Sequence, residues 1–222
     1  MTWNAMSCSS WRLYVIVDRV AVGNRNLAEV ATAAIHGGAD VIQLRDKHAT
    51  TRSLFEEAKR LLPLTRAAAI PLIINDRADI AHAVGADGVH LGEDDLPVKD
   101  ARRLLGEDRI IGTSTHSLEQ AMRAEAEGAD YIGFGPIFPT PTKPDYESIG
   151  VTLIKQVMRQ VRIPIVCIGG IDSANLPQVI QAGAERVAVV RAVCSAADPE
   201  SAARTLKAAI VQFAHTTSAT KL

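Results

Sequence analysis

The sequence predicts an α/β fold: a single (β/α)8 TIM barrel with a closed, parallel, eight-stranded sheet. Short β-branched runs alternate with stretches of helical periodicity along the chain. These runs are almost continuously apolar, as expected for a parallel sheet that is covered on both faces. Four Gly-Ala-acid repeats precede predicted strands. Eight evenly spaced units favour a closed barrel over the competing open, doubly wound sheet.

The predicted strands and helices alternate in strict order. The strands are 13–17, 41–44, 72–74, 88–91, 110–112, 131–134, 165–168 and 186–190. The helices are 27–36, 53–68, 78–84, 98–105, 118–127, 152–160, 174–182 and 200–213. Ser117, with Gln120 three residues later, is typical of a capping box at a helix start.

The Gly-Ala-acid repeats begin at Gly38, Gly85, Gly128 and Gly183. Glycine readily adopts the left-handed conformation that ends a helix, so each repeat turns the chain into the next strand. The repeats therefore mark the end of the barrel at which helices lead into strands.

Composition limits the possible functions. The chain has 222 residues, with 24 Lys plus Arg against 25 Asp plus Glu, a net charge of −1. This balance argues against general nucleic-acid binding, which needs a broad positive field. Three widely spaced cysteines form neither a disulfide framework nor a zinc motif, so we expect a cytoplasmic protein. We also expect no signal peptide or membrane span, and a homo-oligomer is possible.

The domain prediction has three parts. Residues 1–10 are expected to form a flexible leader, 11–215 the catalytic barrel and 216–222 a tail. No composition break indicates a second domain.

Catalytic groups of such barrels lie where strands lead into helices. Here, polar residues follow nearly every predicted strand: Asp18, Gln43 to Lys47, Asn75 to Arg77, His90 to Asp95, Thr113 to His116, Gly135 to Lys143, Gly169-Gly170, and Val190-Arg191. Arg45 offers a planar fork for phosphate oxygens and Lys47 a point charge, although the Arg-Asp-Lys run also fits a solvated loop.

Asp76 and Asp95 follow adjacent strands and could share Mg²⁺, which typically takes one or two carboxylates and completes its shell with water and phosphate. The alternative is that each carboxylate only caps the next helix. Gly169-Gly170 could present backbone N–H groups to an anion or form a simple tight turn. Ser114 could donate to a phosphate or cap locally.

Other features narrow the chemistry. The long segment 135–150, with several prolines and Lys143, suggests a lid, or else a surface loop. His90, His116 and Cys167 are interpreted mainly as structural. The absence of a serine triad, a dinucleotide fingerprint and a Walker loop argues against most hydride-transfer and ATP-dependent functions.

The sequence resembles the thiamine phosphate synthase family from about residue 13 to residue 206. The resemblance rests on six motifs in order: Gln43-Leu44-Arg45-Asp46-Lys47, Asn75-Asp76-Arg77, Gly88-Val89-His90-Leu91-Gly92 through Asp95, Gly112-Thr113-Ser114-Thr115-His116, Gly135 to Lys143, and Gly169-Gly170-Ile171.

The resemblance implies that a hydroxymethylpyrimidine diphosphate and a thiazole phosphate are joined, with release of pyrophosphate. It implies that the pyrimidine diphosphate is held by Gln43, Leu44, Arg45, Asp46, Lys47, Asn75, Ser114 and Lys143. It implies that Asp76 and Asp95 bind Mg²⁺. The thiazole phosphate would contact Thr140, Pro141, Thr142, Gly170, Val190 and Arg191.

The implied mechanism is dissociative, so catalysis depends on neutralising the departing pyrophosphate. Arg45, Lys47, Ser114 and Lys143 are the expected catalytic residues. Two departures from the family pattern are Glu93, where glutamine is common, and Asp46, where glutamate is common.

Arg191 is a third departure, since serine is common there, and it leaves the thiazole-phosphate contact open. Two other functions remain as alternatives: a related thiazole tautomerase, and a non-catalytic sensor of phosphorylated ligands on the same barrel.

Overall fold

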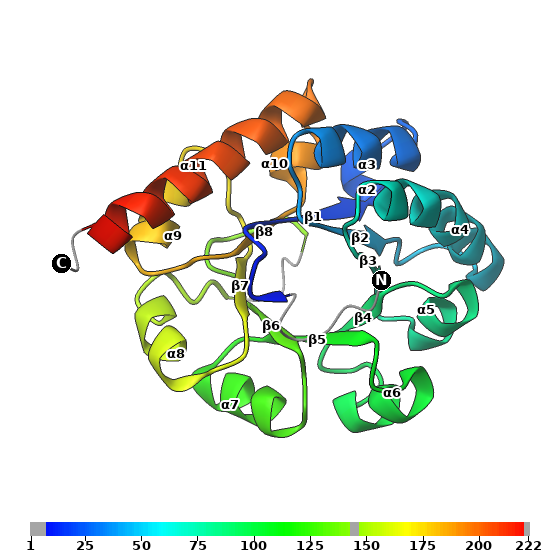
Figure 1. The fold of residues 1–222 in the computed structure, drawn as a ribbon, viewed down its shortest axis with the longest axis horizontal. Helices are drawn as coiled ribbons and strands as arrows, with labels where there is room; N and C mark the ends of the chain where they lie inside the picture. Colours follow the sequence, from blue (N-terminus) through cyan, green and yellow to red (C-terminus); the bar gives the residue numbers. More distant parts are fainter. Residues whose placement is uncertain (1–7, 143–146, 220–222) are drawn as a thin grey trace.

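The computed structural model describes residues 8–142 and 147–219, and within them it shows the predicted closed barrel (Figure 1). The strands are β1 (Leu13–Asp18), β2 (Val41–Arg45), β3 (Leu72–Asn75), β4 (Gly88–Leu91), β5 (Ile110–Thr115), β6 (Tyr131–Phe134), β7 (Ile165–Ile168) and β8 (Val187–Val189). Each strand pairs in parallel with the next, and β1 closes the barrel against β8.

Helices surround this sheet in a ring (Figure 1). They are α2 (Arg19–Val22), α3 (Leu27–His36), α4 (Thr51–Ala67), α5 (Ala78–Val84), α6 (Val98–Leu105), α7 (Leu118–Ala126), α8 (Ile154–Gln160), α9 (Leu176–Gln181), α10 (Arg191–Cys194) and α11 (Pro199–Ala219). No helix in the described part of the chain has the length and apolar character needed to cross a membrane.

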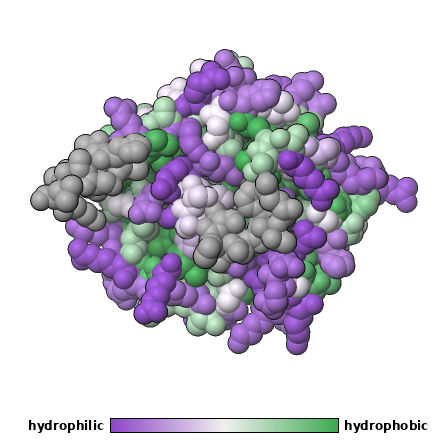
Figure 2. Space-filling view, in the orientation of Figure 1, coloured by the Kyte–Doolittle hydropathy of each residue, from purple (hydrophilic) through white to green (hydrophobic). Residues whose placement is uncertain are grey.

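Two apolar clusters follow from the alternation of strand side chains. Outward-facing residues such as Val15, Leu44 and Ile74 pack against the helices. Inward-facing residues such as Trp11 and Tyr14 fill the amino-terminal half of the barrel. On the face shown in Figure 2, hydrophilic side chains project around the periphery, with hydrophobic side chains between them.

The Gly-Ala-acid repeats lie where the sequence predicted them, and each first glycine has a positive φ. The aspartates of three repeats also have a structural role, because each accepts a hydrogen bond from a backbone amide at the start of a neighbouring strand. Asp40 accepts from the Leu13 amide at 2.9 Å, Asp87 from Leu72 at 2.8 Å, and Asp130 from Ile111 at 2.7 Å. These carboxylates fasten the amino-terminal end of the barrel.

Several predicted boundaries were wrong. Strand β5 continues to Thr115, because the polar residues after Gly112 still pair with β6. The short helices α2 and α10 were not predicted. Helix α8 starts at Ile154 rather than at residue 152, and α9 starts at Leu176 rather than at residue 174.

The two ends of the barrel domain also differ from expectation. Cys8 is fully buried against the amino-terminal cluster, so the expected flexible leader does not include it. Residues 1–7 lie outside the described residues. Helix α11 extends to Ala219, into the segment predicted as a tail.

Candidate functional site

A cavity of about 480 Å³ opens at the carboxyl-terminal ends of the strands. Among the predicted site residues, those that line it are Gln43, Arg45, Lys47, Asn75, Asp76, Ser114, Thr140, Pro141, Thr142, Gly170, Val190 and Arg191. These residues come from six of the eight strands or the loops that follow them. The motifs identified in the sequence therefore converge on one space.

Four predicted site residues are placed differently. Leu44 is fully buried in the outer cluster, and Asp46 is not part of the cavity lining. The alternation of side chains along β2 explains why Leu44 does not line the cavity. Gln43 and Arg45 point into the barrel, whereas Leu44 points towards the helices. Asp95 lies outside the lining but beside Asp76. Lys143 lies outside the described residues.

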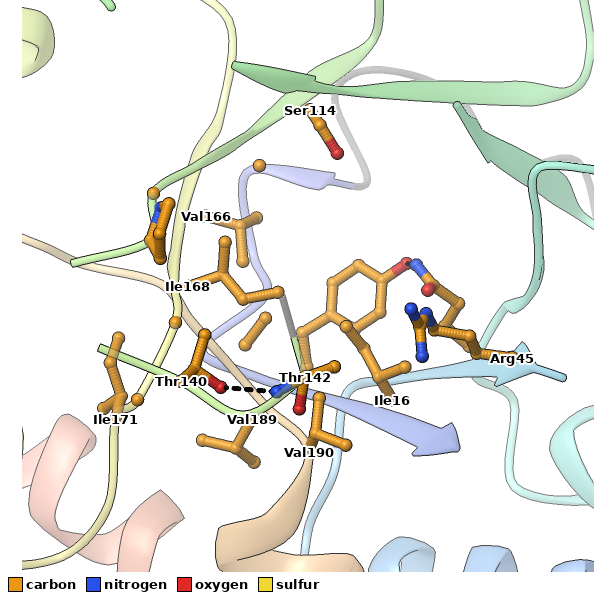
Figure 3. Close-up of a pocket in the computed structure, with 18 of the residues that line it drawn as sticks. Ile16, Arg45, Ser114, Thr140, Thr142, Val166, Ile168, Ile171, Val189 and Val190 are labelled. Atoms are coloured by element: carbon orange, nitrogen blue, oxygen red, sulfur yellow. Dashed lines mark hydrogen bonds between the residues drawn. The ribbon is translucent and has the colours of Figure 1, made fainter. Parts of the chain in front are cut away.

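Arg45 is held in place by the end of strand β1. Its guanidinium forms an ion pair with Oδ2 of Asp18, and both side chains are largely buried. The other carboxylate oxygen of Asp18 accepts a hydrogen bond from the Ala21 amide at 2.9 Å, which caps α2. One aspartate thus positions both the helix and the arginine that faces the cavity, as Figure 3 illustrates for Arg45.

Lys47 and Asp76 form a second ion pair, with 2.9 Å between Nζ and Oδ2. Asp76 has a φ of 63°, a left-handed conformation that is unusual for a residue other than glycine. Its amide donates to the His90 carbonyl at 2.8 Å, so β4 holds this backbone turn. Such strain is often found at functional sites.

Asp95 is anchored next to this pair by the Gly92 amide, which donates to Oδ2 at 2.6 Å. Burial and the neighbouring Asp76 carboxylate both raise the pKa of Asp95. Neither carboxylate is a helix cap: α5 begins after Arg77 and α6 after Pro97, without a side-chain cap at either. The structure therefore does not support the capping alternative for either carboxylate.

The floor of the cavity contains polar residues that sequence analysis did not assign to the site. Tyr14 and Tyr131 line the cavity from β1 and β6, and His90 lies between Tyr131 and Ser114. Because the two tyrosines sit within apolar strands, only the inward register of the strands could have identified them. His90 stands out at its strand end, but the sequence analysis interpreted it mainly as structural.

The opposite wall is apolar. Figure 3 shows Ile16, Val166, Ile168, Val189 and Val190 around the space between Ser114 and Thr140. This surface suits the face of a flat heterocycle. In the loop after β6, the Thr142 amide donates a hydrogen bond to Oγ1 of Thr140 at 3.3 Å. This bond helps to order the loop.

Positions 169 and 170 require glycine for two reasons: both have a positive φ, and neighbouring atoms leave no room for a Cβ. A Cβ on Gly169 would lie 2.4 Å from Pro136, and one on Gly170 would lie 2.6 Å from the carbonyl oxygen of Pro139. The pair therefore lets the loop after β7 approach the loop after β6, where both line the cavity.

Taken together, fold and site define a class: a (βα)8 barrel that presents Arg, Lys and hydroxyl groups in a cavity at its carboxyl-terminal end, with two neighbouring carboxylates beside it.

Comparison with known proteins narrows this class. The thiamine monophosphate synthase family model matches residues 13–193. The chain is 52% identical over 201 residues to a thiamine-phosphate synthase of Chloroflexus aurantiacus, covering 90% of this chain and 93% of that protein. It is 47% identical over 201 residues to that of Shouchella clausii, covering 90% and 96%.

A solved structure agrees. The chain superimposes on a thiamine phosphate pyrophosphorylase from Pyrococcus furiosus with a TM-score of 0.86 and 39% identity, covering 93% of this chain and 98% of the other. The protein belongs to the thiamine monophosphate synthase family.

Proposed function

We propose that this protein is a thiamine phosphate synthase, a transferase that couples 4-amino-2-methyl-5-hydroxymethylpyrimidine diphosphate to thiazole phosphate and releases pyrophosphate. The observation that carries the proposal is the convergence of Arg45, Lys47, Asp76 and Ser114 on one cavity in a member of this family.

The reaction needs charge stabilisation more than a nucleophile. Breaking the C–O bond leaves a pyrimidine cation and a pyrophosphate that carries several negative charges. Two unit charges about 4 Å apart at an effective dielectric constant near 20 interact by about 4 kcal/mol. Only the increase of that attraction in the transition state accelerates the reaction, so each cation contributes about one to three decades in rate.

Arg45 and Lys47 are arranged for this role, because each is oriented by an aspartate before substrate binds. Preorganised charges need no rearrangement when the leaving group develops its charge. Lys143 belongs to the same proposal on the strength of the family motif alone, since it lies outside the described residues.

Asp76 and Asp95 fit a magnesium site. They present two carboxylates side by side, and burial together with the neighbouring Asp76 carboxylate raises the pKa of Asp95. No cluster of three or more His, Cys, Asp or Glu ligands occurs among the described residues. Mg²⁺ commonly binds through one or two carboxylates together with substrate phosphates, and it would add positive charge beside the pyrophosphate.

The thiazole phosphate is proposed to bind at Thr140 to Thr142, Gly170 and Val190-Arg191. Two hydroxyls, backbone amides and one guanidinium are available there. A guanidinium is itself a good phosphate ligand, which makes Arg191 compatible with this role despite the family's usual serine. Thiazole nitrogen then captures the pyrimidine cation, with no covalent enzyme intermediate.

The remaining expectations concern the setting of the enzyme. Its family implies small-molecule substrates. We propose a cytoplasmic location, supported by Cys8, Cys167 and Cys194, which are all free thiols. The possible homo-oligomer, the absence of nucleic-acid partners and the lid formed by 135–150 stay predictions.

One assay tests the proposed function. The protein is incubated with both phosphorylated heterocycles, with and without Mg²⁺, and pyrophosphate is measured. Mg²⁺-dependent release that requires both substrates supports the synthase. Isomerisation of the thiazole without pyrophosphate release would point to a tautomerase, and tight binding of thiamine phosphate without turnover would point to a sensor.

A further inference from the structure

Five polar side chains form one continuous hydrogen-bonded chain across the cavity floor. The Gln43 amide nitrogen, Nε2, lies 2.8 Å from the Tyr14 hydroxyl, which lies 2.9 Å from the Tyr131 hydroxyl. The Tyr131 hydroxyl lies 2.9 Å from Nδ1 of His90, and Nε2 of His90 lies 3.1 Å from Oγ of Ser114. The chain thus links β1, β2, β4, β5 and β6.

Both tyrosines in this chain are neutral phenols. Tyr131 is fully buried and Tyr14 is 2% exposed, and burial raises the pKa of each hydroxyl above its ordinary value. Each phenol therefore has a single proton to donate and an oxygen that accepts.

The direction of the chain follows from this count of protons. Nε2 of Gln43 can only donate, so the Tyr14 oxygen accepts. Among the described residues, the other partner of the Tyr14 hydroxyl is Tyr131, so the Tyr14 proton goes to the Tyr131 oxygen, because it would otherwise be buried without an acceptor. The Tyr131 proton then goes to Nδ1 of His90. His90 with an acceptor at Nδ1 is the tautomer that carries its proton on Nε2, and this proton is donated to Ser114.

The two ends of the chain consequently present opposite groups to the cavity. Among the described residues, no donor forms a hydrogen bond with the buried Oε1 of Gln43. This oxygen can therefore accept a hydrogen bond from a ligand. Ser114 accepts from His90 and keeps its own hydroxyl proton for an acceptor in the cavity.

Packing holds the chain in register. A Cβ on Gly112 would lie 2.1 Å from the ring of Tyr131, and one on Gly133 would lie 3.1 Å from His90 Cε1, so these two glycines make room for both rings. Trp11 packs edge-on against Tyr14 and Tyr131, with ring centroids 5.9 and 5.2 Å away.

We infer that Tyr14, Tyr131 and His90 are positioning residues that fix Gln43 as an acceptor and Ser114 as a donor, and thereby make the cavity select a 4-aminopyrimidine over its 4-oxo analogue. This inference rests on the proposed function, because it takes the pyrimidine as the ligand of the floor.

The chemistry of the two analogues differs at the relevant group. A 4-amino substituent donates N–H to Gln43 Oε1, whereas a 4-oxo substituent would place a second acceptor against it. Leaving a buried acceptor unpaired is unfavourable, which disfavours the 4-oxo analogue. As the C–O bond breaks, the amino group shares the positive charge and becomes a stronger donor, so this contact strengthens towards the transition state.

The test compares the 4-amino and 4-oxo pyrimidine diphosphates as substrates of the wild-type chain, Tyr14→Phe and Tyr131→Phe. The wild type should prefer the amino substrate by at least about tenfold in kcat/KM, and each variant should lower that ratio about tenfold. In each variant, the decrease in kcat/KM for the 4-amino substrate should lie mainly in kcat. The double variant should lower the amino-to-oxo ratio little more than either single variant, because one substitution already interrupts the hydrogen-bonded chain.

Thr115→Val is the matched control. It removes another buried hydroxyl from β5, which bonds the Gly133 carbonyl at 3.2 Å and lies outside the cavity lining. It should lower the melting temperature without changing the amino-to-oxo ratio. An unchanged ratio in Tyr14→Phe and Tyr131→Phe, or a wild-type preference for the oxo substrate, would overturn the inference.

Calorimetric binding of the two free hydroxymethylpyrimidines to the wild type separates this inference from the proposed function. A preference for the amino compound without pyrophosphate release in the assay would contradict the synthase but support the selective floor. Turnover without any amino preference in binding or kcat/KM would support the synthase and contradict the directional chain, even if neither tyrosine variant folds.

Discussion

The two ends of the barrel use the same residue types for different purposes. At the amino-terminal end, Asp130 bonds a strand amide and Arg102, and Asp40 bonds strand amides and Lys207, so each carboxylate is satisfied within the protein. At the carboxyl-terminal end, Asp76 adopts a strained backbone beside Asp95. The difference indicates that one end is built for stability and the other for binding charge.

The largest expected effect is on rate at the carboxyl-terminal end. Lys47→Ala should lower the single-turnover rate about a hundredfold, because it removes a cation that stabilises the leaving group, while substrate affinity should fall much less. Lys47 is half-exposed, so the melting temperature should barely change.

Lys207→Ala is its counterpart at the amino-terminal end, because Lys207 also pairs with an aspartate. It should lower stability and leave the rate unchanged. Equal losses of rate and substrate affinity in Lys47→Ala, measured by single-turnover kinetics and direct titration, would argue against a transition-state role.

The next effect is on stability at the amino-terminal end. Asp130→Ala should lower the free energy of unfolding by about 2–3 kcal/mol, because it leaves the Ile111 amide and the largely buried Arg102 guanidinium without their carboxylate partner. Urea unfolding measures this loss.

Asp79→Ala is the control for that experiment, since it removes a solvent-exposed aspartate paired with Arg77 at 2.6 Å. Exposed pairs contribute about 0–1 kcal/mol. If Asp130→Ala is no more destabilising than Asp79→Ala, the amino-terminal carboxylates are not structural fasteners.

The smallest effect is a gain in stability. Asp76 and Ala69 are the two residues other than glycine with a positive φ in the described part of the chain, with φ values of 63° and 54°. Asp76→Gly and Ala69→Gly should each stabilise the fold by about 0.5–1 kcal/mol, because glycine relieves the left-handed strain. Only Asp76→Gly should reduce pyrophosphate release. A stability loss in both variants by thermal unfolding would show that neither backbone is strained.

The fold, and which residues would gather at the carboxyl-terminal ends of the strands, could be predicted from the sequence. Both depend on patterns of residues that are close together in the sequence. Apolar runs, helical periods and the Gly-Ala-acid repeats define the barrel order. Charged residues such as Arg45, the last residue of β2, and Lys47, two positions beyond it, stand out at the strand end.

The cavity floor was harder to predict. Tyr14 and Tyr131 are 117 positions apart, and their contact depends on which face of each strand points inward and on the register between strands. His90 was interpreted mainly as structural because its partners come from other strands. Similarly, whether Asp76 and Asp95 cap helices or share a cation depends on the helix starts, which local sequence defines poorly.

The most direct test of the central claim is the Mg²⁺ dependence of pyrophosphate release in the wild type and in Asp95→Asn. If cationic groups and a divalent ion at the carboxyl-terminal end neutralise the leaving group, the variant should need about tenfold more Mg²⁺ for half-maximal release. An identical Mg²⁺ titration for the two proteins would contradict the account.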